Sequence, residues 1–137
     1  MDNTLRYLSL ARKAGKAELG EEPVGAAARA LHAHVILVAK DASDHTWRRA
    51  KSFAAGTDQQ CIRLDCSKDE MGQAIGRTSL AIAAITDIGL ALALAESANV
   101  NPDTLSVLSQ KAQHAKKRQA EAKAHLRNKR IRKKSKM

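Results

Sequence analysis

The cationic side chains near the C-terminus are the residues of this chain whose type and spacing most clearly predict a partner. Residues 111–137 hold twelve Lys/Arg against one acid, so their formal charge is +11, whereas residues 1–110 hold twelve against thirteen, which gives −1. Such a segment attracts polyanions, and nucleic acid is the commonest large one in a cell. We therefore predict nucleic-acid contacts for the basic residues Lys116, Lys117, Arg118, Arg127, Lys129, Arg130, Arg132, Lys133 and Lys134.

Two other interpretations of this tail stay open. A charged segment can be a solvated helix or a solubilising extension, although such helices usually mix the two signs of charge. Binding to a membrane surface would need bulky apolar residues opposite the charges, and Leu126 and Ile131 supply little apolar area. Nucleic acid is the partner that the twelve-to-one charge bias favours, and we expect no membrane partner.

The length and composition limit the number of domains, the mode of RNA recognition and the presence of membrane segments. The length of 137 residues suits one domain with an extension, and 44% of the residues are apolar. Tyr7, Trp47 and Phe53 are the three aromatic residues, too few for a sheet that stacks bases on several rings. The N-terminus is polar and the apolar runs are short, so we expect neither a signal peptide nor a membrane span.

The patterns typical of enzymes and metal sites are absent from the sequence. It contains no Gly-x-Ser-x-Gly, no phosphate-binding Gly-Lys-Ser/Thr loop, no Gly-x-Gly-x-x-Gly and no His-Glu-x-x-His. Cys61 and Cys66 are too few for a disulfide framework, which suggests a reducing, cytoplasmic location. The pair could be half of a metal site, but no second Cys pair or His cluster accompanies it. His32, His34 and His45 show no acid–base partner at motif spacing. We therefore expect no catalysis, no cofactor, no metal and no small-molecule substrate.

The periodicity of the body predicts an alternation of helices and strands. Helical spacing at residues 4–14 is followed by a short strand at 16–19 and an Ala-rich helix at 21–33 with acids in its first turn. Residues 35–39 (VILVA) are β-branched and apolar without alternation, as in a strand buried on both faces. Such an order favours an α/β fold in which a sheet lies between two helix layers.

The second half of the body continues the pattern. Ser43 and its neighbours can cap a helix at about 45–55, and Ser67-x-x-Glu70 fits a capping box that opens a short helix ending at Gly76. Asp87 is a candidate cap for a helix at 89–98, and Asp103 for another that extends to about residue 126. The predicted strands are 61–65 and 80–85, and residues 128–137 are expected to be disordered when unbound.

Several strings in this order resemble the kink-turn RNA-binding ribosomal-protein superfamily, the L-seven-Ae and L-thirty-e group, and most closely its bacterial YlxQ-like branch. They are residues 8–16 (LSLARKAGK), 20–22 (GEE), 35–43 (VILVAKDAS), 71–76 (MGQAIG) and 83–87 (AAITD). The resemblance covers residues 5–96 and implies a three-layer α/β/α sandwich with a four-stranded mixed sheet. It implies a domain at residues 1–98, followed by a basic helical or disordered extension at 99–137.

The resemblance also implies which residues of the body contact a sharply bent RNA. They belong to the start of the second helix, the loop after the central strand and the loop after the last strand: Gly20, Glu21, Glu22 and Arg29; Lys40 and Asp41; and Ile85, Thr86 and Asp87. A helix N-terminus presents free N–H groups to phosphate, and glycine lets a backbone approach closely. An exposed Ile85 would pack under an extruded base.

Glu22, Pro23 and Ala26 depart from the family pattern, which often has Asn at the first of these positions and Lys at the third. Two functions therefore stay open. One is a non-catalytic, ribosome-associated protein that docks on structured, kink-turn-like RNA, with the tail on nearby phosphates. The other is a protein-interaction module that no longer binds RNA specifically and is anchored to RNA or DNA by the tail alone. Residues 20–29 could instead form a helix that only packs against the body. Residues 40–41 could be an ordinary polar turn without an RNA contact.

Overall fold

The computed structural model describes residues 3–135, with side chains to residue 127, and it has one four-stranded mixed sheet. The strand order is β1-β4-β2-β3; β2 and β3 run parallel, while β4 is antiparallel to β1 and to β2. The strands are β1 (Ala17–Leu19), β2 (Val35–Val38), β3 (Gln60–Arg63) and β4 (Ile82–Ile85). The α/β class and the four-stranded mixed sheet predicted from the sequence are confirmed.

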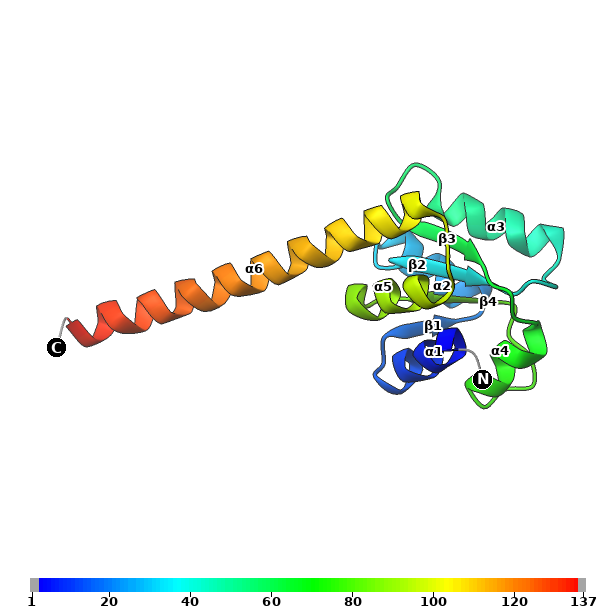
Figure 1. The fold of residues 1–137 in the computed structure, drawn as a ribbon, viewed down its shortest axis with the longest axis horizontal. Coiled ribbons are helices and arrows are strands. Elements are labelled where there is room, and N and C mark those ends of the chain that lie inside the picture. Colours follow the sequence, from blue (N-terminus) through cyan, green and yellow to red (C-terminus); the bar gives the residue numbers. More distant parts are fainter. Residues whose placement is uncertain (1–2, 136–137) are drawn as a thin grey trace.

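Helices cover both faces of the sheet (Figure 1). α2 and α3 contact each other and the central strands, while α1, α4 and α5 form a second group in which α1 contacts both α4 and α5. Every residue of β2 and β4 is buried, as expected of strands covered on both faces. The helices are α1 (Asn3–Lys13), α2 (Glu21–Arg29), α3 (Asp44–Ala54), α4 (Lys68–Ala74), α5 (Ile88–Ser97) and α6 (Pro102–Ser135).

Local capping chemistry sets several of these boundaries as the sequence predicts. Ser67 and Glu70 form the expected capping box at the start of α4. The Asp87 carboxylate accepts a hydrogen bond from the Leu90 amide at 2.9 Å and caps α5. The expected cap of α6 is wrong by two residues, because the Asn101 side chain accepts the amide of Asp103 at 2.8 Å.

The C-terminal helix differs most from expectation. α6 continues through residues 128–135, which were expected to be disordered, while residues 136–137 lie outside the described part of the chain. Its first turns pack on α5, and Leu108 is fully buried in the core. Side chains 116–127 are all exposed, so this stretch leaves the body as a solvent-exposed rod (Figure 1).

Gly72 explains how α4 packs against the loop that leads to β4. A Cβ at this position would lie 2.6 Å from the Ser79 amide nitrogen, so no larger residue fits without movement of the loop. Gly72 therefore serves close packing, and Gly76, at φ +75°, makes the turn that follows α4.

Candidate functional site

The sheet topology divides the predicted RNA-contact residues between two opposite edges. Leu19 pairs with Ala83 in β4, and Ile82 at the start of β4 pairs with Val38 at the end of β2. The start of α2, the loop after β2 and the loop before β4 therefore meet at one edge of the sheet. We call it the Lys40 edge; it comprises residues 20–22, 40–44, 65–70 and 77–79.

The end of β4 lies at the other edge, together with the start of β2. The His34 amide donates to the Ile85 carbonyl at 3.1 Å, and the Thr86 amide donates to the Lys16 carbonyl at 2.9 Å. Asp58 precedes β3 at this same edge and pairs with Lys111 of α6. We call it the Asp58 edge; it comprises residues 16, 29–34, 57–59 and 86–87, with 111–118 of α6.

This division corrects the predicted site. Ile85 is fully buried as the last residue of β4, so it is not in an exposed loop and cannot pack under a base. Thr86 and Asp87 lie at the Asp58 edge and do not join Gly20 and Lys40, because β4 runs antiparallel to β2. Arg29 ends α2 and lies at the Asp58 edge as well. The third segment that does join the Lys40 edge is the loop at residues 77–79, which the sequence interpretation missed.

At the Lys40 edge, Gly20 lets the chain turn from β1 into α2. Its φ of +95° and ψ of 163° suit glycine almost alone, and its amide donates to the Ile82 carbonyl at 3.0 Å. No side chain in the described part of the chain caps α2 at Gly20, which leaves N–H groups at the helix start open to a ligand, and Pro23 removes one of them. The local backbone can therefore accept an anion.

The charges around that helix start are less favourable to an anion. Glu21 is held by Arg49, whose Nε lies 2.6 Å from the Glu21 carboxylate, and Asp41 accepts the Lys68 amide at 2.8 Å. The Asp41 carboxylate thus ties the loop after β2 to the start of α4. The Lys40 edge as defined carries seven carboxylates, counting Glu21 and Asp41, and three cationic side chains: Lys40, Lys68 and Arg77. Arg49 of α3 adds a fourth cation through its pair with Glu21.

The Asp58 edge has the reverse balance. It carries six Lys/Arg and three histidines against two carboxylates, Asp58 and Asp87. Both carboxylates are engaged, since Asp58 lies 2.9 Å from the Lys111 Nζ and Asp87 caps α5. Phosphate is therefore attracted to the Asp58 edge more strongly than to the Lys40 edge. The cationic residues are Lys16, Arg29, Lys111, Lys116, Lys117 and Arg118.

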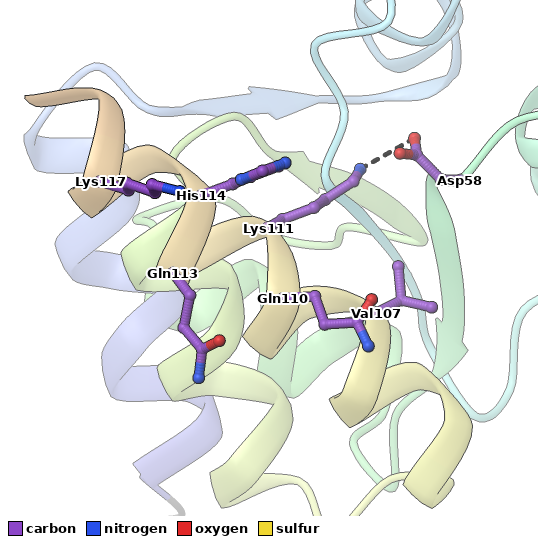
Figure 2. A pocket seen from close by; sticks show the side chains of 7 residues that line it. All are labelled: Asp58, Val107, Gln110, Lys111, Gln113, His114 and Lys117. Atoms are coloured by element: carbon purple, nitrogen blue, oxygen red, sulfur yellow. Dashed lines mark ion pairs between the residues drawn. The ribbon is translucent and has the colours of Figure 1, made fainter. Parts of the chain in front are cut away.

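Open grooves run beside α6 at this edge. One, of about 610 Å³, is bordered by Lys111, His114 and Lys117 of α6 and by Asp58 of the body; Figure 2 shows Lys111 and His114 extending in the same direction, with Lys111 paired to Asp58. A second, of about 370 Å³, shares Asp58, Lys111 and His114 and reaches Leu31, His34 and Ile88. The first turns of α6 and the body therefore build these grooves together.

His34 stands out among the groups that line the second groove. Its Nδ1 is buried and has no hydrogen-bond partner among the described residues. Burial, together with the nearby positive charge of Lys111, lowers the pKa of this imidazole below its usual range, while Asp87 and Asp58 act in the opposite direction. The neutral imidazole is thus favoured in the folded chain.

The described part of the chain offers little support for a metal site, a reactive cysteine or a membrane-spanning helix. No group of three or more His, Cys, Asp or Glu side chains there could hold a metal ion. Burial raises the pKa of the Cys61 thiol to about 11, which makes it a poor nucleophile. Within residues 3–135, no helix combines the length and the apolar character that crossing a membrane requires.

Solved structures share this fold. A protein of unknown function from Bacillus halodurans C is 22% identical, with a TM-score of 0.68, and the match covers 73% of this chain and 100% of that one. The Giardia lamblia 15.5kD RNA binding protein is 15% identical, with a TM-score of 0.59, over 76% of this chain and 85% of its own. No protein-family model and no curated protein matches the sequence. At these identities the likeness establishes the fold.

Proposed function

We propose that this chain is a non-catalytic RNA-binding protein whose Asp58 edge and α6 contact the phosphate backbone. The observation that carries the proposal is the charge partition: the Asp58 edge has six Lys/Arg against two carboxylates, one of which pairs with Lys111, and an exposed basic helix continues it. Lys123 and Arg127 extend this basic surface beyond the body. The fold shared with the 15.5kD RNA binding protein supports RNA as the polyanion.

The salt dependence of RNA binding tests this function. A surface that makes six to ten phosphate contacts loses roughly 10³–10⁵-fold in affinity between 50 and 200 mM salt. The test variant keeps the full length of the chain but replaces Lys123, Arg127, Lys129, Arg130, Arg132, Lys133 and Lys134 with Gln. We expect its salt slope to fall by roughly 0.7–0.9 for each phosphate that the variant no longer neutralises.

The Lys40 edge provides the matched control. Replacing Lys40, Lys68 and Arg77 with Gln removes cations from the carboxylate-rich edge, and we expect a much smaller change in the salt slope per charge removed. Equal changes per charge at both surfaces would contradict the proposal. So would RNA binding by the unaltered chain that does not depend on salt.

Docking of a kink-turn-like RNA, for example in ribosomal RNA, is the second part of the proposal and concerns the Lys40 edge. Its support is local: the uncapped start of α2, the glycine conformation at Gly20, and the convergence of Lys40 with the loop at Arg77. Glu21 does not oppose phosphate with its full charge, because Arg49 pairs with it. The contacts predicted from the sequence at residues 20–22 and 40–41 therefore stay together in this proposal.

The chain with the neutralised α6 separates the two functions that the sequence left open. If the Lys40 edge recognises bent RNA, this variant still prefers a kink-turn RNA over a straight duplex of equal length, and Lys40→Gln with Arg77→Gln removes the preference. If the variant shows no preference, the body is better described as a protein-interaction module that α6 anchors to RNA.

A further inference from the structure

The groove between the end of α2, the connection from β4 to α5, and α6 combines features that one ligand class explains together. It has a volume of about 370 Å³ and continues into the larger groove beside α6 through Asp58, Lys111 and His114. Volumes of this size fall in the range of small-ligand sites. The groove exists because the first turns of α6 are packed against the body, which Leu108 secures from the core.

The α6 side of the groove carries cationic residues, and the body side combines apolar with polar residues. Lys111 and Arg118 border it from α6, and Lys117 follows in the adjoining groove. Leu31 and Ile88 border it from the body, together with His34 and with Asp58, which pairs with Lys111. A negatively charged group next to a flat, largely apolar group with polar edges would suit the cations of α6 and the apolar side chains of Leu31 and Ile88.

The backbone conformation and the exposure of Leu31 support a ligand in this groove independently. It follows the end of α2 with a φ of +62°, a conformation usually left to Gly or Asn, and its side chain is 62% exposed. The Leu31 amide donates to the Ala28 carbonyl at 3.0 Å and the His32 amide to the Ala27 carbonyl at 2.9 Å, so the motif itself needs only backbone atoms. The helix end does not require a leucine, and the exposed apolar side chain is available to a ligand.

We propose that this groove binds an unpaired nucleotide of an RNA strand that lies along α6. The base packs against Leu31 and Ile88, its edge meets His34, and the flanking phosphates face Lys111 and Arg118. The inference rests on the RNA-binding function proposed above and adds a preference for unpaired RNA. A base within a duplex is stacked and paired, so it cannot enter a groove between helices, whereas an unpaired base can.

Leu31→Gly is the first test variant, because glycine suits the backbone at this position. Binding of the full chain to a single-stranded oligonucleotide and to a duplex is measured in parallel. We expect about fivefold weaker binding of the single strand and unchanged binding of the duplex, as for the removal of one side chain that packs on a base. Leu10→Ala is the control, because Leu10 is also an exposed leucine, 46% exposed, but lies on α1 away from the groove.

Arg118→Gln and Lys123→Gln form a second matched pair on α6. Each removes one positive charge, but only Arg118 borders the groove. We expect Arg118→Gln to weaken single-strand binding more than duplex binding, and Lys123→Gln to weaken both equally. Ultraviolet crosslinking of an oligonucleotide that carries one 4-thiouridine should place the crosslink on the segments around Leu31 and Ile88.

The outcomes separate the groove from the general function. If the unaltered chain binds both RNAs with a steep salt dependence but Leu31→Gly affects neither, the groove proposal is overturned and the RNA-binding function stands. A protein segment as the occupant would give this same result. If a free nucleoside monophosphate competes as effectively as the oligonucleotide, the groove takes nucleotides that do not belong to a strand, and the proposal of an RNA strand is overturned.

Discussion

Leu108→Ala tests whether the start of α6 belongs to the folded body. Leu108 is fully buried, and it is a member of the hydrophobic core although it lies beyond residue 98, where the extension was expected to begin. Truncating a buried leucine to alanine typically costs about 2–5 kcal/mol, because the lost transfer free energy and the remaining cavity add. We expect a loss of about 3 kcal/mol in the free energy of unfolding.

The same substitution at Leu126 is the control, because this residue lies on the same helix but is 57% exposed. Leu126→Ala should change the free energy of unfolding by less than about 0.5 kcal/mol. Urea unfolding is best followed through the fluorescence of Trp47, the single tryptophan, which lies on α3 and therefore reports on the body. A helix-sensitive signal would include the exposed part of α6, which need not unfold with the core.

The result that would refute this reasoning is a Leu108→Ala chain that unfolds at the same urea concentration as the Leu126→Ala chain. It would mean that α6 is attached too weakly to contribute to the body, and the expected domain boundary at residues 98/99 would then describe the folding unit. If the substitution is instead as costly as expected, a deletion of the tail should begin no earlier than residue 116, the first of the fully exposed stretch. The same deletion would keep the Lys111–Asp58 ion pair intact.

Three further predictions concern single residues of the body. Leu31→Gly should raise the free energy of unfolding by about 0.5–1 kcal/mol in urea titrations, because a positive φ strains leucine and not glycine; a loss of stability would show that the Leu31 side chain supports the fold. Because the pKa of His34 is lowered in the folded protein, the stability linked to it is complete above about pH 6.5 and declines as the pH falls. His34→Gln should make the urea midpoint less dependent on pH between about 7.5 and 5.5, and an unchanged dependence would contradict this. Gly72→Ala should cost about 1–3 kcal/mol, because the added methyl group overlaps the Ser79 backbone, and a neutral result would show that the loop moves freely.

Local sequence signals predicted most of the fold because local chemistry determines those features. The apolar run in β2 matches its complete burial, and the Ser67–Glu70 capping box forms as its spacing indicates. The Ala-rich helix α2 ends earlier than its composition suggests, because residue 31 turns into the left-handed region. A leucine there gives no signal of a helix end, since Gly and Asn are the residues that usually mark it.

The site could be predicted only in part, because it depends on strand direction. Sequence patterns do not reveal that β4 runs antiparallel to β2, and this direction decides whether Thr86 or Arg77 lies beside Lys40. A topology with β4 parallel to β2 would have placed the end of β4 at the Lys40 edge. The resemblance implied the correct fold and two segments that do lie together, but the third segment that it indicated lies at the opposite end of β4.

The composition of α5 carries a signal about α6 that a charge count alone does not reveal. Its sequence, IGLALALAES, is apolar almost all round, and a helix of that kind must be covered on several sides. α1 and β4 cover two of them, and α6 covers a third. A polar chain that continued from residue 99 as a free tail would have left that side of α5 exposed to water.

The attachment of α6 through α5 decides where the positive charge of the tail can act. Because Leu108 and the Lys111–Asp58 pair fix the first turns, the exposed stretch leaves from the Asp58 edge, on the side of the sheet opposite the Lys40 edge. About twenty helical residues beyond residue 115 span roughly 30 Å in that direction. A disordered tail could have folded back toward the Lys40 edge, whereas a helix continuous with the body cannot. An RNA held by both edges must therefore reach across the body, and an RNA held by α6 alone never meets the Lys40 edge.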